Sequence, residues 1–559
     1  MASPPAVFKL NPAPVSMHGL DNRGIEAGSI PGVGYGRFGR MFDFSQRQLP
    51  DDCLVDIAKS MIKVDISKSI NEAEAVDENP TIPSGYTYFG QFVDHDISLD
   101  PTPLSAKRAD IAALEDFRTP ALDLDCIYGR GPDDQPYMYS DGLHLRLGKP
   151  IHADGAVVAT KRDVLRLDGG NGKFPAILGD KRNDENRIVS QIQSVFIAFH
   201  NKVVDDAAMI AAAGGEFADS QSRFRTAAML VRWHYQWLVV NDFLPRIVET
   251  GMVAEVLNPG GSPRLDNYDR GAKFAYMPVE FAGAAYRFGH SMVRPGYALN
   301  KTAGSTAATP NRIAIFNRSG VATDNLNGFG VPMPDNFAID WSFFLDGLDH
   351  SHVPGFKVPQ PSYRIDASLV DPLGDLPEFR DKGSPFTNLA YRNLARGVAN
   401  LRLPSGEQVA RALGLVPLAP EILWSAGSKI MDESKLDPDD RGPDGDYEKT
   451  VARRKLVLDK WVKSSGAGQG ALRGATPLWY YILREAEYFG FDRIDEGPTA
   501  GFGGHHLGPV GSRIVVETFI GLLWHDTTSY LRRWPGFAPM IPHSRVGFKL
   551  ADLFNYALA

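Results

Sequence analysis

Residues 90–96 read Gly-Gln-Phe-Val-Asp-His-Asp and gather an amide, two carboxylates and an imidazole within about two helical turns. On a helix that advances about 100° per residue, Gln91, Asp94 and His95 share one face, and Asp96 turns away from it. Taken alone, such a string is typical of a polar helix end or a capping cluster. A metal hydrolase that uses His and Asp is the other general interpretation, but no second cluster at metal-ligand spacing follows.

The rest of the chain favours a mainly α fold, because apolar residues recur at spacings of three and four and sustained alternation is almost absent. The clearest helix is expected over about residues 186–205, with Asn183 or Asp184 as its cap. A second is expected over about residues 226–248, interrupted near Pro245, and a third from about Pro278 to Val293. Weaker helical patterns cover residues 384–399, 407–413, 446–462, 477–489 and 512–531.

Length and composition indicate one large domain. The 559 residues, 43% of them hydrophobic, can bury a large core, and nothing divides the chain between residues 86 and 559. Residues 1–85, rich in Pro, Gly and short polar clusters, are expected to form an extended arm packed on that domain. The net charge of -8 is scattered without the basic stripe that nucleic acid requires, and no apolar stretch is long enough to span a membrane.

The cysteines and the N-terminus bear on the compartment. Cys53 and Cys126 are the only two cysteines, so no disulfide framework is expected and one bridge is the most that could form. The first residues lack a basic segment followed by a long apolar run, so a secretory signal is not expected. The sequence therefore leaves two locations possible, the cytoplasm or the cell exterior after secretion without a leader. No pattern indicates the oligomeric state.

Four further stretches carry polar residues in motif-like order. Residues 119–129 read Thr-Pro-Ala-Leu-Asp-Leu-Asp-Cys-Ile-Tyr-Gly, and residues 179–185 read Gly-Asp-Lys-Arg-Asn-Asp-Glu. Residues 281–290 read Phe-Ala-Gly-Ala-Ala-Tyr-Arg-Phe-Gly-His, and residues 391–397 read Tyr-Arg-Asn-Leu-Ala-Arg-Gly. Singly, the first passes for a turn, the second for a charged helix start and the third for a helix with a core histidine.

Together with residues 90–96, and in this order over about 300 residues from Gly90 to about Pro404, the stretches resemble the animal haem peroxidase family. The resemblance implies a single large helical domain with little β structure. It also implies a haem of the b type and a bound calcium ion. The lack of disulfides is similar to a bacterial member of the family.

On the distal side of the haem, the resemblance makes His95 the residue that moves a proton between the peroxide oxygens. Arg182 becomes the permanent cation of the peroxide pocket, and Gln91 orders water or a halide there. Asp94 and Glu185 match the family's two carboxylates that form ester links to haem. Asn186 stands where myeloperoxidase has a Met that forms a third link, so a sulfonium bond is excluded and efficient chloride oxidation is not expected.

On the proximal side, the resemblance makes His290 the axial ligand of the haem iron. Arg287 and Arg396 are expected to reach haem propionates, and Asn393 to accept the ring N–H of His290 and set its basicity. Between Arg396 and Leu403 the chain carries one residue more than mammalian members of the family.

The resemblance also implies a calcium site, formed by the residue after His95 and by the stretch at residues 119–129. The implied ligands are Asp96, Thr119, the carbonyl of Ala121, Asp123 and Asp125. Hard oxygen donors at alternate positions of a tight loop suit calcium, and fixing Asp96 would also fix the adjacent His95.

The implied function is a haem peroxidase that reduces hydrogen peroxide and oxidises small donors such as phenols, iodide, bromide or thiocyanate through a ferryl intermediate. A fatty-acid dioxygenase is the alternative, but those related enzymes carry a radical-forming Tyr three residues before the proximal His. Here that position is Arg287, and Tyr286 is one residue further back. A non-catalytic haem- or calcium-binding structural protein is a second alternative.

Overall fold

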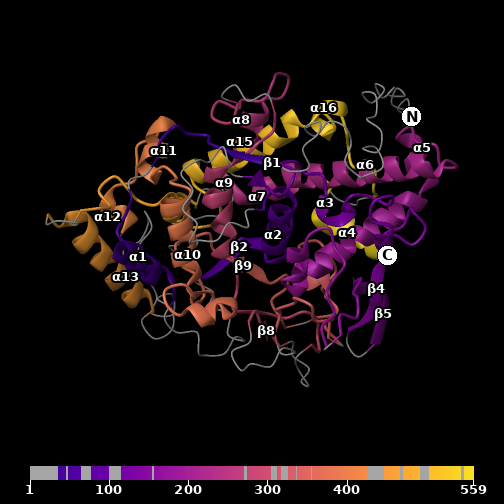
Figure 1. Cartoon of the computed structure of the whole chain (residues 1–559), viewed down its shortest axis with the longest axis horizontal. Coiled ribbons are helices and arrows are strands. Elements are labelled where there is room, and N and C mark those ends of the chain that lie inside the picture. Colours follow the sequence, from indigo (N-terminus) through magenta and orange to yellow (C-terminus); the bar gives the residue numbers. More distant parts are fainter. Residues whose placement is uncertain are drawn as a thin grey trace.

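The computed structural model describes residues 36–45, 48–63, 77–99, 115–153, 156–170, 172–269, 274–303, 311–316, 325–334, 336–353, 355–424, 446–465, 470–490, 503–542 and 547–559. Within these ranges the fold is mainly helical, as predicted, and α2 lies at the centre of the view, between α4 and α6 on one side and α9 and α10 on the other (Figure 1). The α-helices are α1 (Asp51–Met61), α2 (Gly85–Ile97), α3 (Asp125–Tyr128), α4 (Arg187–Asp205), α5 (Ala207–Ala212), α6 (Ser220–Leu238), α7 (Leu244–Ile247), α8 (Met252–Leu257), α9 (Val279–Gly283), α10 (Leu389–Ala395), α11 (Gly406–Ala412), α12 (Pro420–Leu423), α13 (Asp446–Val457), α14 (Leu478–Phe489), α15 (Pro509–His525), α16 (Tyr530–Arg533) and α17 (Leu550–Leu558). Short 3-10 segments are η2 (Pro136–Met138), η3 (Lys181–Asp184), η5 (Ala285–His290), η7 (Trp341–Phe343), η8 (Asp371–Gly374) and η9 (Pro377–Lys382), and π segments are η4 (Val239–Phe243), η10 (Arg396–Asn400) and η14 (Leu458–Lys463).

Helix α2 carries residues 90–96 into the middle of the core. The ring of Phe92 stacks on Phe196 of α4 with centroids 5.0 Å apart, and Phe89 meets Phe243 edge-on at 5.6 Å. Burying such a ring stabilises the fold by about 1.5–3 kcal/mol. These rings pack α2 against α4 and against the π segment η4, and Gln91 and His95 lie on a neighbouring part of the helix surface.

Helix α4 confirms the strongest helix prediction, but its cap is a different residue. The side chain of Asn186 accepts a hydrogen bond from the N–H of Ile188 at 2.8 Å and begins the helix. Asn183 and Asp184, the predicted caps, lie instead in the 3-10 segment η3, which Asp180 caps by accepting from the N–H of Arg182. The prediction was wrong because an additional turn precedes the helix.

The predicted third helix is broken at Ala284, six residues before His290. Helix α9 ends at Gly283, Ala284 leaves the helical conformation at φ -142° and ψ -68°, and η5 continues as a 3-10 helix to His290. A Cβ on Gly283 would lie 2.5 Å from the side chain of Leu401, so the backbone approaches its neighbour closely there. The periodicity predicted one continuous helix because it does not report this close approach.

The other helix predictions hold with shifted limits. Helix α6 begins earlier than expected and runs through the π segment η4 into α7, across Pro245. The segment predicted over 512–531 is divided into α15 and α16 because the chain leaves the helix at Asp526. Helices α10, α11, α13 and α14 confirm the weaker patterns.

Strands form small sheets around the helices of the described ranges. The pairs are β1 (Gly36–Gly39) with β3 (Glu115–Asp116) and with β6 (Met277–Pro278), β2 (Glu78–Pro83) with β9 (Pro361–Tyr363), β4 (Leu147–Ala153) with β5 (Ala156–Val164), and β7 (Gly296–Tyr297) with β8 (Ile313–Ala314). All are antiparallel except the pair of β1 with β6. The β4–β5 hairpin was not predicted, although the Asp-Gly pair at 154–155 is a hairpin signal in the sequence.

The described part of the N-terminal arm packs on the rest of the chain. The carboxylate of Glu280 in α9 accepts from the N–H groups of Met41 and Phe42 at 3.1 and 3.3 Å. The arm is not extended throughout, because Asp51–Met61 forms helix α1, which contacts α10 and α13. Residues 1–35 lie outside the described residues, and the boundary at residue 85 stays a prediction.

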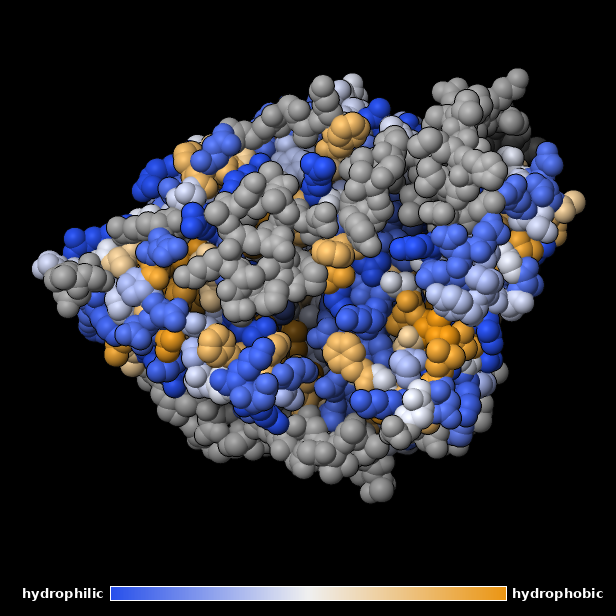
Figure 2. Space-filling view, viewed as in Figure 1, coloured by the Kyte–Doolittle hydropathy of each residue, from blue (hydrophilic) through white to orange (hydrophobic). Residues whose placement is uncertain are grey.

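The surface and the cysteines agree with the composition. Apolar residues on the face shown in Figure 2 form small groups among hydrophilic ones. None of the described helices is both long enough and apolar enough to cross a membrane. Cys53 and Cys126 are both buried and free, so the one possible bridge is not formed.

Candidate active site

His95 is buried at the end of α2 and keeps a neutral ring. Its Nδ1 lies 2.7 Å from Oδ1 of Asn183, and its backbone carbonyl accepts from Nη2 of Arg182 at 2.9 Å. Burial, together with the positive charge of Arg182, lowers the pKa of His95 to about 3. A neutral imidazole beside a permanent cation is the pairing that general base catalysis on a small acid requires.

Arg182 is held in place by a buried carboxylate. Its Nη2 donates to Oδ2 of Asp180 at 2.6 Å, and its Nε lies 3.1 Å from the same oxygen. Burial alone would raise the pKa of Asp180, but the charges of Arg182 and Arg118 outweigh it and lower that pKa to about 2. Asp180 therefore stays ionised and fixes the guanidinium next to His95. The structure brings these two predicted catalytic residues together, and Gln91 lies half-buried on α2, one turn before His95.

Asp94 and Glu185 are carboxylates whose environment disfavours their charge. Burial raises the pKa of Asp94, although Arg182 and Arg287 oppose it, and Oδ1 of Asp94 accepts from Ser98 Oγ at 3.1 Å. Burial and the charge of Glu378 raise the pKa of Glu185 to about 7, with Asp94 contributing in the same direction. Two such carboxylates within electrostatic range of each other fit the predicted ester links to a haem group.

His290 ends η5 and is bound to Asn393. Nδ2 of Asn393 lies 3.0 Å from Nδ1 of His290, and Oδ1 of Asn393 accepts from Nη1 of Arg287 at 2.9 Å. With the NH₂ group of Asn393 toward Nδ1, the hydrogen of a neutral His290 ring lies on Nε2, whereas an iron ligand needs the lone pair there. Iron binding through Nε2 therefore requires the other orientation of the Asn393 amide, in which its oxygen accepts the N–H of His290 as predicted from the sequence. Burial and the charge of Arg287 lower the pKa of His290 to about 3, which keeps the ring neutral, as a metal ligand must be.

The proximal segment touches the distal helix. The hydroxyl of Tyr286 donates to the carbonyl of Gly90 at 3.2 Å, so η5 and α2 are in direct contact. Arg396 is half-buried at the start of the π segment η10.

The three carboxylates of the predicted calcium site come together. Oxygen atoms of Asp96, Asp123 and Asp125 lie within 4.8 Å of one another, and Thr119 Oγ1 donates to Asp123 Oδ2 at 2.6 Å. Burial and the charge of Asp123 raise the pKa of Asp125 to about 7, and burial and the two other carboxylates raise the pKa of Asp96 well above its ordinary value. Two buried carboxylates and a half-buried one this close need positive charge to stay ionised, so the donor set fits calcium. Ala121 lies in the turn between them, where its N–H donates to the carbonyl of Thr119 at 2.8 Å.

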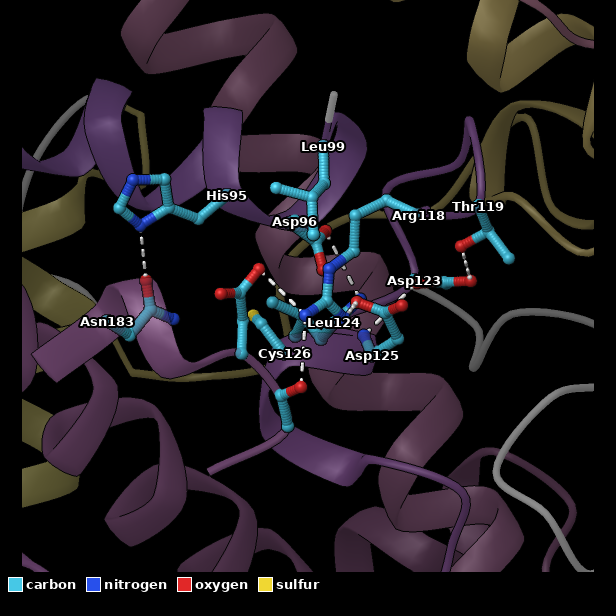
Figure 3. Close-up of polar contacts among 12 residues, drawn as sticks. His95, Asp96, Leu99, Arg118, Thr119, Asp123, Leu124, Asp125, Cys126 and Asn183 are labelled. Atoms are coloured by element: carbon cyan, nitrogen blue, oxygen red, sulfur yellow. Dashed lines mark hydrogen bonds and ion pairs between the residues drawn. The ribbon is translucent and has the colours of Figure 1, made fainter. Parts of the chain in front are cut away.

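Arg118, which the sequence did not single out, joins this acidic cluster to the distal arginine (Figure 3). Its Nη1 lies 2.9 Å from Asp125 Oδ1, and its Nη2 lies 2.7 Å from Asp180 Oδ2. Nη2 also donates to the carbonyl of Gly179 at 3.0 Å. Arg118 directly precedes the motif at residue 119, but no spacing rule indicates that its side chain reaches residue 180.

His200 has partners on both ring nitrogens: the Tyr128 hydroxyl at 3.1 Å and the Leu143 carbonyl at 2.9 Å. It therefore has no free nitrogen for chemistry.

Asn183 and Gln193 form a buried connection behind His95 that the sequence did not reveal. Asn183 was expected to be only a helix cap, and Gln193 lies among the polar positions of α4 that periodicity assigns to a solvated face.

This mainly helical chain buries two neutral histidines and two carboxylates of raised pKa on contacting segments. The family model "Animal haem peroxidase" matches residues 116–332, in agreement with the resemblance of the sequence motifs to that family. The matched residues include Arg182, Glu185, Arg287 and His290, whereas α2 precedes them and Asn393 follows them.

Among solved structures similar to the chain, one shares its fold. Peroxidase A from Dictyostelium discoideum is 14% identical, with a TM-score of 0.53, and the alignment covers 96% of each chain. A fatty acid alpha-dioxygenase from Arabidopsis thaliana is 14% identical, with a TM-score of 0.49, over 94% of this chain and 76% of that one. None of the curated proteins matches the chain.

Proposed function

We propose that the protein is a haem peroxidase that reduces hydrogen peroxide and oxidises small donors such as phenols, iodide, bromide or thiocyanate. The observation that carries this proposal is the hydrogen bond from Arg182 to the backbone carbonyl of His95, which keeps a guanidinium that Asp180 fixes in place within electrostatic range of a neutral buried imidazole. Peroxide cleavage needs a base for the proton of one oxygen and a positive charge for the oxygen that leaves.

The chain's own residues divide this work. His95 takes the proton from one oxygen of the peroxide and returns it to the other. Arg182 stabilises the charge that develops on the leaving oxygen, and Gln91 orients water or an anion in the same pocket. Haem, when bound, supplies the redox-active iron.

The remaining site residues would hold and tune the haem. His290 is proposed as its axial ligand and Asn393 as the residue that orients the His290 ring. Arg287 and Arg396 would bind the propionates. Calcium at Asp96, Asp123 and Asp125, with Thr119 and the Ala121 carbonyl, would fix the end of α2.

Fatty-acid oxygenation is the competing activity within the same fold. Tyr286 is buried, its ring stacks on Phe281 at 4.6 Å, and its hydroxyl is engaged by Gly90. Arg287 occupies the position three residues before His290, and its Nε donates to Ala282. We therefore expect no oxygen uptake with linoleate above the haem-free background in an oxygen electrode, under conditions in which peroxide-dependent oxidation of a phenol proceeds. Rapid uptake that Tyr286→Phe abolishes would overturn the peroxidase proposal.

The two buried carboxylates predict covalent haem attachment. After turnover with peroxide, we expect the wild-type protein to retain haem on the polypeptide through acid-acetone extraction. Asp94→Asn and Glu185→Gln should each leave one link, and the double variant should release all haem, since an amide forms no ester under these conditions. Mass spectrometry of haem-bearing peptides checks each link.

Asp116→Asn is the matched control for this experiment, because Asp116 is also a buried aspartate whose pKa burial raises, and it accepts hydrogen bonds from backbone N–H groups. It should retain haem as the wild type does. Quantitative haem release from the wild-type protein would contradict the ester assignment.

A further inference from the structure

A chain of buried amides runs from His95 to a backbone carbonyl. Asn183 Oδ1 lies 2.7 Å from Nδ1 of His95, and Asn183 Nδ2 donates to Gln193 Oε1 at 2.8 Å. Nε2 of Gln193 then donates to the carbonyl of Cys126 at 3.0 Å. Both amide side chains are fully buried, so water does not compete for these bonds. Figure 3 shows Asn183 beside the His95 ring, with Cys126 on the side of the acidic cluster.

The carbonyl of Cys126, where this series of hydrogen bonds ends, fixes the direction of every hydrogen bond in the series. A backbone carbonyl can only accept, so Gln193 must turn its NH₂ group toward Cys126 and its oxygen toward Asn183. Asn183 must then turn its NH₂ group toward Gln193 and its oxygen toward His95. Turning either amide over would bring two acceptors or two donors together in a buried place, which costs about 1–3 kcal/mol for each unsatisfied group.

The Cys126 carbonyl therefore determines which ring nitrogen of His95 carries the proton. An amide oxygen facing Nδ1 requires a hydrogen on Nδ1, and a neutral ring then has its lone pair on Nε2. We propose that Asn183 and Gln193 are positioning residues that hold His95 in the tautomer with hydrogen on Nδ1, which leaves Nε2 free to accept a proton from a ligand. This inference rests on the proposed function only in taking His95 to be the distal base.

The backbone carbonyl of Cys126 is itself fixed by a second hydrogen bond. The carbonyl of Cys126 accepts a second bond from the N–H of Gly179 at 3.0 Å. A Cβ at Gly179 would lie 2.2 Å from the carbonyl oxygen of Asp125 and 2.7 Å from that of Cys126, so this approach requires glycine. Because Cys126 directly follows Asp125, the tautomer of His95 is tied to the loop of the acidic cluster.

Cyanide capture by the ferric holoprotein tests this tautomer without peroxide turnover. Hydrogen cyanide is neutral and binds ferric haem as the anion, so its proton must move to a base: HCN and neutral imidazole give CN⁻ and imidazolium, with no change of oxidation state. Nitric oxide binds ferric haem without losing a proton. The ratio of the two association rates in stopped-flow absorption therefore isolates the base from the shape of the pocket.

We expect Asn183→Leu to slow cyanide association by about tenfold or more, because the ring loses the acceptor that selects its tautomer. Gln193→Met should slow it by several-fold, because Asn183 can then turn over. Nitric oxide association should change by less than about twofold in both variants.

Gln191→Met is the matched control, because Gln191 is buried on the same helix and donates to a backbone carbonyl, that of Arg162, at 3.2 Å. It has no bond to the His95 chain and should behave as wild type. Wild-type cyanide rates in both Asn183→Leu and Gln193→Met would overturn the inference. Equal slowing of cyanide and nitric oxide would also overturn it.

A measurement on the wild-type protein tests the tautomer directly, so the inference stays testable if the variants do not fold. In the diamagnetic ferrous carbon monoxide form labelled with ¹⁵N-histidine, Nδ1 of His95 should show the shift of a protonated ring nitrogen and Nε2 that of an unprotonated one. His95→Gln assigns the signals, and the reverse pattern overturns the inference. A holoprotein that shows this tautomer and captures cyanide but does not turn over peroxide would refute the proposed function and leave this inference standing.

Discussion

Replacing His95 by alanine is expected to slow the reaction of the haem-loaded protein with hydrogen peroxide by about 10²–10⁴-fold, the usual contribution of a positioned general base. The ring is neutral and lies next to a guanidinium, so it can take and return one proton within the pocket. His290 is untouched by the substitution, so haem content should stay at the wild-type level. Stopped-flow absorption with peroxide, on samples matched for haem, gives the rate.

His234→Ala is the control for the general cost of removing a buried imidazole. His234 is also buried, with its two ring nitrogens bound to the Leu230 carbonyl at 2.7 Å and the Met540 N–H at 2.9 Å. It should cost stability and leave the peroxide rate of the folded fraction unchanged. An undiminished rate in His95→Ala would refute the assigned role of His95.

Removing calcium is expected to produce the second large effect, a loss of folding stability. With free calcium at about 1,000 times its dissociation constant, binding contributes about 4 kcal/mol, and chelation removes this contribution. The three clustered carboxylates must then take up protons or repel one another, as the raised pKa values of Asp96, Asp123 and Asp125 indicate. The midpoint of thermal unfolding, followed by circular dichroism, should fall by several degrees on addition of a chelator and recover with calcium.

Asp123→Asn should reproduce the chelated state and no longer respond to calcium, and elemental analysis should find about one calcium per wild-type chain. Asp141→Asn is the control, since Asp141 is an exposed carboxylate bound to His144 at 2.7 Å and lies outside the cluster. It should keep the calcium response. A wild-type protein that contains no calcium and unfolds at the same temperature with or without chelator would exclude the site.

Periodicity located the helices well where their packing is regular. Helix α4 follows its apolar repeat over nearly all its length, and α14 begins within one residue of the prediction. Prediction failed where a distant contact decides the backbone. The break at Ala284 goes with the approach of Gly283 to Leu401, and no local pattern contains the position of a residue more than 100 places away.

By itself, the sequence determined the mainly α class, the resemblance to the animal haem peroxidases and the order of the motifs, because residue types at fixed short spacings carry that information. It also placed Gln91 and His95 on one face of a helix and Asp96 on the other, which follows from helical geometry alone. The tertiary structure decided which distant groups meet: Arg118 with Asp180, and Gln193 with Asn183. These contacts depend on how helices pack, and a single buried carbonyl, that of Cys126, then sets a direction of hydrogen bonding that no sequence spacing encodes.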